Sequence, residues 1–161
     1  MPKIDDILIS YGAYHRHQEN RRTHFIGVPL VTLGFLLLLN LCFGSVTPFM
    51  SPTAWFALGV CLVYLVLSVR LALVLLLPFL VLAGVANVLG MLGLGGMGFV
   101  ICMGVGWYFQ LKGHRAEGNK PALTTNLLQL FAAPLFLAAE FLFQRGWNPE
   151  LAHQVHHGQR A

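Results

Sequence analysis

Long apolar runs separated by short polar stretches dominate the sequence after its first 24 residues. Four of these runs approach the length of a membrane-spanning helix: 25–44, 54–69, 71–91 and 99–111. A helix of about 20 residues rises about 30 Å, which is the thickness of the hydrocarbon layer of a bilayer. The pattern therefore predicts four spanning helices within residues 25–111.

A fifth apolar run, residues 127–144, is interrupted by Gln129, Pro134 and Glu140. A carboxylate near the middle of a bilayer costs about 3 kcal/mol even on scales derived from insertion experiments. A proline inside a helix also frees a backbone carbonyl, which then needs a partner. The run predicts a helix that either spans the membrane or enters it and returns, and we favour the second alternative.

Polar segments flank these runs. Residues 1–24 predict a helix at the membrane interface, because the apolar side chains of Ile4, Ile7 and Leu8 recur at helical spacing. Residues 112–126 predict a polar loop, and residues 145–161 a polar tail. We therefore expect a single domain over residues 1–161. Its fold class is an all-α integral membrane bundle of four spanning helices plus a fifth spanning or re-entrant helix.

Composition supports a lipid bilayer as the surroundings of this chain. Hydrophobic residues make up 57% of the sequence and charged residues only 10%, whereas a soluble domain carries about 25% charged residues. The formal net charge of +4 is small, and the basic residues flank the apolar runs. That distribution suits lipid headgroups and cytoplasmic loops better than nucleic acid, so we expect no nucleic-acid partner.

The basic residues also predict the orientation of the helices. With four spans, those before residue 121 fall on one side, and the two intervening turns carry no charge. They are Lys3, Arg16, Arg21, Arg22, Arg70, Lys112, Arg115 and Lys120. The positive-inside rule makes this the cytoplasmic side. We expect a multi-pass protein of the inner membrane in a bacterium, or of the endoplasmic reticulum in a eukaryote.

Histidines on that same side are the candidate chemistry of the chain. His15 and His24 precede the first apolar run, and His114 follows the fourth. Imidazole binds iron, zinc and copper well. Three histidines that converge, with Glu19 and Glu117 nearby, would make a ferrous site with open positions for dioxygen. No Ser-His-Asp or Cys-His arrangement suggests a different chemistry.

Two motifs that contain these histidines resemble the iron-dependent 2-hydroxy fatty acid dioxygenases of fatty acid α-oxidation. The first motif consists of Tyr11, His15, Asn20, His24, Gly27 and Pro29. The second consists of Trp107, Gln110, Gly113, His114, Glu117 and the Pro-Ala-Leu run 121–123. A weaker match lies in residues 133–136 with Glu140. The resemblance extends from Tyr11 to about Phe143.

The resemblance implies Fe²⁺ as cofactor and a long-chain 2-hydroxy fatty acid and O₂ as substrates. The product would be a fatty acid one carbon shorter. His15, His24 and His114 would bind the metal, and Glu117 would be a catalytic-site residue that orients His114. The cations that could neutralise the substrate carboxylate are Arg21, Arg22, Arg115 and Lys120.

Two alternatives stay open at this point. The tail contains His153, His156 and His157 in an H-x-x-H-H pattern, which resembles one histidine box of di-iron membrane hydroxylases and desaturases. These three histidines are second-rank metal ligands, although the further boxes of that class are missing. The other alternative is a non-catalytic membrane transporter or assembly protein. The spans carry no charge in their middle, which argues against a polar transport path.

Overall fold

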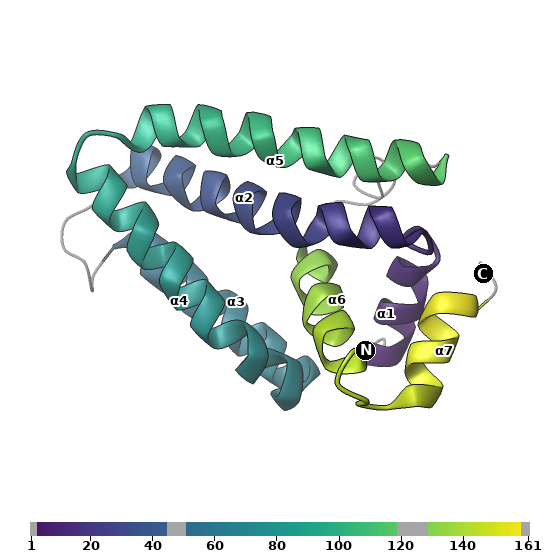
Figure 1. The fold of residues 1–161 in the computed structure, drawn as a ribbon. Helices are drawn as coiled ribbons and strands as arrows, with labels where there is room; N and C mark the ends of the chain where they lie inside the picture. Colours follow the sequence, from purple (N-terminus) through teal and green to yellow (C-terminus); the bar gives the residue numbers. More distant parts are fainter. Residues whose placement is uncertain (1–2, 45–50, 119–128, 159–161) are drawn as a thin grey trace. The chain divides into compact units, whose positions relative to one another are not determined.

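The structure is a computed structural model, and it describes residues 3–44, 51–118 and 129–158. Within these ranges every regular element is an α-helix, as the all-α fold class predicts. In chain order the helices are α1 (Ile4–Gly12), α2 (Gln18–Phe43), α3 (Pro52–Leu67), α4 (Val69–Met91), α5 (Gly95–Glu117), α6 (Gln129–Phe143) and α7 (Pro149–His157). Figure 1 colours them from the N-terminus to the C-terminus.

Close contacts divide the chain into two compact units. The first unit comprises Met1–Ile26 together with Phe109–Ala161, and the second comprises Gly27–Tyr108. The two long helices α2 and α5 run through both units. The division separates the polar ends of these helices from their apolar lengths. A single domain over residues 1–161 stays a prediction.

In the unit Gly27–Tyr108, α3 and α4 pack against each other and are joined by Ser68 (Figure 1). The side chain of Ser68 accepts a hydrogen bond from the amide of Leu71 and so caps α4. Buried polar side chains join further helices: the Asn87 carbonyl accepts from Thr53 at 2.6 Å and from Asn40 at 3.2 Å. Polar side chains in an apolar helix bundle need such partners.

By length and composition, α2 and α4 could each cross a bilayer, while α3 and α6 are shorter apolar helices. Helices thus lie in the four predicted runs, but four crossings stay a prediction. The fifteen residues of α6 rise only about 22 Å, which is less than the hydrocarbon thickness.

In three polar segments the helices begin or end at other residues than the sequence pattern predicted. The N-terminal helix ends at Gly12, and α2 already begins at Gln18, inside the segment predicted as one surface helix. At the other end, α5 continues to Glu117, whereas we had predicted a loop from residue 112. Lysine, arginine, alanine and glutamate favour helices, so nothing ends α5 before Gly118, whose φ is 71°.

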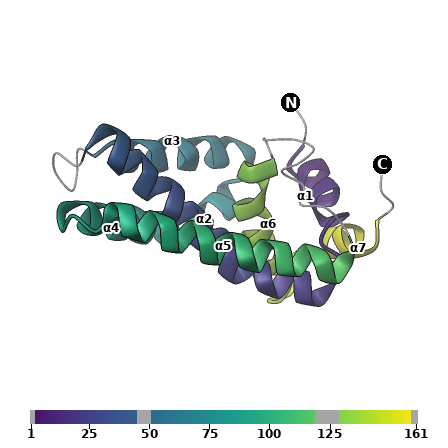
Figure 2. The same ribbon diagram turned by 90° about the horizontal axis from the view of Figure 1, so that it is seen from above.

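The tail also contains a helix, α7, which the predicted polar tail did not include. Asn148 caps it by accepting the amide of Leu151 at 3.2 Å, and Pro149 fits its first position. Leu151 and Val155 are buried one turn apart. In this unit α1 packs against both α6 and α7 (Figure 2). The helix of the tail therefore lies beside the N-terminal helix.

Glycines let α5 approach α2 closely. A methyl group at Gly106 would lie 3.0 Å from the backbone nitrogen of Val31. One at Gly113 would collide with the side chains of Asn20 and Thr23 and lie 3.1 Å from the Asn20 Cα atom. Because Gly113 precedes His114, this close approach brings that histidine to the start of α2.

We predict that Gly113→Ala lowers the free energy of unfolding by roughly 1–3 kcal/mol, as overpacking of a close contact does. Gly104→Ala is the matched control on the same helix, because a methyl group there meets no atom within 4 Å. The control should be neutral or stabilising, since alanine favours helices. Thermal unfolding of both variants in detergent checks this. Equal stability of the two variants would contradict the close approach.

Candidate metal centre

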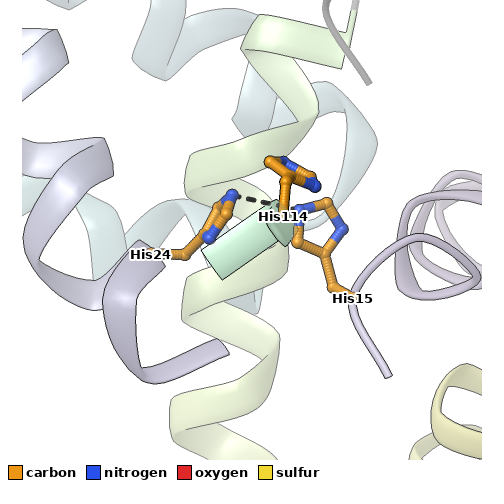
Figure 3. Close-up of side chains that lie close together, drawn as sticks. All are labelled: His15, His24 and His114. Atoms are coloured by element: carbon orange, nitrogen blue, oxygen red, sulfur yellow. Dashed lines mark hydrogen bonds between the residues drawn. The ribbon is translucent and has the colours of Figure 1, made fainter. Parts of the chain in front are cut away.

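Three histidines from different parts of the chain meet inside the unit formed by the two chain ends (Figure 3). His15 lies in the connection between α1 and α2, His24 in the second turn of α2, and His114 in the last turn of α5. Their side chains are buried, with at most 3% exposure. One nitrogen from each ring lies within 4.8 Å of the others. These are the three histidines that the sequence predicted as metal ligands, and the structure brings them together.

Backbone carbonyls decide which nitrogen of two rings carries the proton. The Nδ1 atom of His15 donates to the carbonyl of Tyr11 at 2.8 Å, and that of His24 to the carbonyl of Asn20 at 2.9 Å. A carbonyl oxygen can only accept, so both Nδ1 atoms must be protonated. In the neutral rings the two Nε2 atoms then carry lone pairs. Such a second hydrogen bond is how proteins orient histidines that bind metals.

These two Nε2 atoms face each other at 3.1 Å, which is an unfavourable contact between lone pairs. Protonation would relieve it, but burial lowers the pKa of His15 well below its usual value, and the neighbouring His24 lowers it further. A metal ion bound by both atoms would turn the repulsion into attraction. Metal–imidazole bonds are about 2.1 Å long, so 3.1 Å suits neighbouring ligand atoms on one ion.

His114 also has a buried ring nitrogen without a partner among the residues that the structure describes. The Nδ1 atom of His114 is buried, and it has no hydrogen-bond partner in the described part of the chain. Burial lowers the pKa of His114, against the smaller opposing effect of the Glu117 charge. The ring is therefore held neutral, as a metal ligand must be. The three residues together fit a divalent metal ion.

An aromatic wall covers one side of His15. The Tyr11 ring stacks on the imidazole with ring centres 4.1 Å apart, and Phe136 of α6 lies 5.4 Å from the same ring. Burial raises the pKa of Tyr11, so its hydroxyl stays protonated. Tyr11 and His15 belong to the first sequence motif, and Phe136 belongs to the weaker match over residues 133–136, but the sequence did not predict that their rings would meet.

Glu117 joins the three segments that carry the histidines. Its Oε1 atom accepts the amide of Arg16 at 2.6 Å, and its Oε2 atom accepts the Asn20 side chain at 2.5 Å. Arg16 follows His15 directly, and Asn20 lies one turn before His24. Glu117 is not in the group of ligand atoms, and no hydrogen bond joins it to the His114 Nδ1 atom. Glu117 therefore connects the segments that carry His15 and His24, and its predicted role in orienting His114 stays a prediction.

The cations proposed for the substrate carboxylate lie in different surroundings. The guanidinium of Arg21 donates to the carbonyls of His15 and Arg16, at 3.3 and 2.6 Å. Its Nε atom lies 3.5 Å from the Glu140 carboxylate. Arg22 and Arg115 are exposed, and Lys120 lies outside the described residues. Arg21 is thus already engaged by groups of the protein.

The tail histidines do not join the three-histidine group. The Nε2 atom of His156 contacts the Glu140 carboxylate at 2.6 Å. His153 and His157 are exposed on α7, with ring centres 4.9 Å apart. The pairing of His156 with a buried carboxylate could not be read from the H-x-x-H-H pattern, because it depends on how α7 folds back.

Comparison with known proteins identifies the family. The model of the 2-hydroxy-palmitic acid dioxygenase Mpo1-like family matches residues 1–145. The chain belongs to the Mpo1-like family. It is 31% identical to 2-hydroxy-palmitic acid dioxygenase MPO1 of Saccharomyces cerevisiae over 151 residues, which cover 91% of this chain and 84% of the yeast protein. No solved structure matches the chain significantly. The matched region of this Mpo1-like protein contains the three histidines and Glu117, but ends before α7.

We predict that Glu117→Ala weakens divalent-metal binding by about 10- to 100-fold, the usual range when a residue that supports the ligands is lost. The reason is that the segments bearing His15 and His24 lose their common link to α5. Titration with Co²⁺, followed by visible absorption, measures the affinity.

The control for this variant is Glu19→Gln. Glu19 is also a carboxylate near the site, but it is exposed and pairs only loosely with exposed Lys112, at 3.8 Å. It should bind Co²⁺ as the wild type does. Equal affinities of the Glu117→Ala and Glu19→Gln variants would show that the link through Glu117 does not support the site.

Proposed function

We propose that this protein is a membrane Fe²⁺-dependent dioxygenase that converts 2-hydroxy fatty acids into fatty acids one carbon shorter. The observation that carries the proposal is the buried group of three neutral imidazoles, two of which present unpaired nitrogens to each other at 3.1 Å. Membership in the Mpo1-like family and the activity for which the yeast relative is named support the same reaction class.

The overall reaction balances with carbon dioxide and water as the other products. A 2-hydroxy acid and O₂ give the shorter acid, CO₂ and H₂O. The bond between carbons 1 and 2 breaks, and carbon 2 becomes the new carboxyl carbon. The two carbons together lose four electrons, which reduce one O₂ molecule fully, so no further reductant is needed. A ferrous ion, when bound, supplies the activation of dioxygen that an organic side chain cannot provide.

The residues of the chain would hold and shield this reaction. His15, His24 and His114 would bind the metal through one nitrogen each and leave its other positions open for the substrate. Their burial would keep water away from the reacting groups. Arg22, Arg115 and Lys120 remain the proposed partners of the substrate carboxylate, because Arg21 is already engaged.

The apolar helices suit a lipid substrate and a bilayer. Large hydrophobic side chains on α3 and α4 are exposed, such as Val66 at 77% and Leu77 at 69%. Such surfaces are costly in water but neutral in lipid. We propose a multi-pass membrane protein with the three histidines at the cytoplasmic interface. The acyl chain would then lie in the apolar part of the bilayer while its polar end reaches the metal.

A single metal ion is favoured over a di-iron centre. The described part of the chain holds one group of three or more metal-ligating side chains close enough to share an ion. The tail histidines, which the di-iron alternative would use, face Glu140 or the surface of α7 instead. A non-catalytic transporter or assembly role would give no reason for three neutral histidines to meet in a buried site.

We predict that alanine at His15, His24 or His114 lowers bound iron from about one ion per chain to near zero and abolishes conversion of 2-hydroxypalmitic acid. Each change removes one of three ligands, and among the residues that the structure describes no fourth ligating side chain belongs to the group. Iron content of the purified protein and mass spectrometry of the shortened product measure the two effects.

His153→Ala is the control for these variants, because His153 is an exposed histidine outside the group. It should keep both iron and activity. Full iron and turnover in any one of the three site variants would remove that residue from the ligand set. Iron binding by the wild type without turnover of 2-hydroxy acids would retain the metal site but overturn the proposed reaction.

A further inference from the structure

A second polar cluster lies next to the three histidines and is built around Glu140. This carboxylate is only 3% exposed, although it lies on α6, an otherwise apolar helix. Burying an unpaired charge is costly, so a buried carboxylate needs charged or donating partners on both oxygens. Glu140 has them: His156 lies 2.6 Å from its Oε1 atom and the Arg21 guanidinium 3.5 Å from its Oε2 atom.

Arg21 continues this cluster to the segment that carries His15. Through one terminal nitrogen it donates to the carbonyls of His15 and Arg16. Arginine suits this task because its planar group presents several donors in fixed directions. A line of contacts therefore runs from His156 on α7, through Glu140 on α6 and Arg21 on α2, to the backbone of a metal-ligand candidate.

A separate contact joins the same two segments. The side chain of Arg16 donates to the carbonyl of Gly158, at the end of α7. Near this contact α7 packs tightly on α1, since a methyl group at Gly12 would lie 2.6 Å from the Val155 side chain. The connection that carries His15 is thus held by α7 from two directions. Figures 1 and 2 show α7 beside α1, which leads into this connection.

We infer that the C-terminal helix α7 is a positioning element of the metal centre, and that His156 acts on His15 through Glu140 and Arg21. This inference rests on the proposed function of the three histidines. It gives the tail a role other than metal ligation, and it assigns Arg21 to the protein scaffold and not to the substrate carboxylate. Glu140 and Arg21 lie within residues 1–145, which the family model matches, and His156 lies after them.

The line of contacts predicts how substitutions combine. His156→Ala removes the donor to Glu140 and leaves a buried carboxylate with one partner, so Arg21 should shift toward Glu140 and release the His15 carbonyl. Glu140→Gln removes the charge that holds Arg21. Because both changes break the same line, their effects on metal affinity should not add.

The test uses the full chain in detergent and Co²⁺ alone as the probe. We expect His156→Ala to lower Co²⁺ affinity by about tenfold and to change the visible absorption of the bound ion, which reports ligand geometry. His156→Gln, which keeps a donor, should recover most of both. The double variant His156→Ala with Glu140→Gln should bind no more weakly than the worse single variant.

His157→Ala is the matched control, because this neighbouring histidine is exposed on the same helix. It should leave affinity and spectrum unchanged. Circular dichroism shows whether each variant folds, and the recovery with His156→Gln separates positioning from general loss of structure. Unchanged Co²⁺ affinity and spectrum in folded His156→Ala, or additive effects in the double variant, would overturn the inference. Absence of Co²⁺ binding by the wild type would instead overturn the proposed metal site.

Discussion

An unfavourable contact between two imidazole nitrogens is the constraint on which the rest of this structure depends. His15 and His24 present lone pairs to each other at 3.1 Å, because both rings have their other nitrogen fixed to a backbone carbonyl. Burial opposes the protonation that would relieve the repulsion. Such a contact costs free energy unless a partner compensates for it. A bound cation is the simplest partner that satisfies both nitrogens.

The surrounding residues hold this arrangement in place. Glu117 joins the connection after His15 to the start of α2, and it does so from the helix that carries His114. Gly113 allows α5 to come close enough for this link. Arg21 also donates a hydrogen bond to the carbonyl of His15, and its guanidinium forms an ion pair with Glu140. The site is therefore supported by contacts among segments that are far apart in the sequence.

Much of the fold could be predicted from the sequence, because hydrophobic runs and helical periodicity are local signals. Helices lie in the four apolar runs, and His15, His24 and His114 come together as predicted. The ends of helices were less predictable. Polar residues with good helix propensity extend α5 through His114 to Glu117. The first part of the segment predicted as a loop is therefore helical.

The roles of the charged residues could not be predicted, because they depend on pairings across long sequence separations. Glu117 is bonded to residues about 100 positions earlier in the chain. From the sequence, Glu140 was only a charged residue that interrupts an apolar run. In the structure its carboxylate contacts His156 of α7. The sequence predicted Arg21 as a cation for the substrate carboxylate. In the structure it donates hydrogen bonds to two backbone carbonyls and forms an ion pair with Glu140. Sequence spacing can show that such a residue is unusual, but it cannot show which residue it pairs with.

X-ray absorption at the iron edge of the reconstituted protein tests the metal centre most directly. We expect a first coordination shell of nitrogen and oxygen only, at about 2.1 Å, with the outer-shell scattering that imidazole rings produce, from about three histidines. The same spectrum from a protein with the three histidines replaced should lose the imidazole signal. A shell without imidazole scattering, or one containing sulfur, would contradict a metal ion held by His15, His24 and His114.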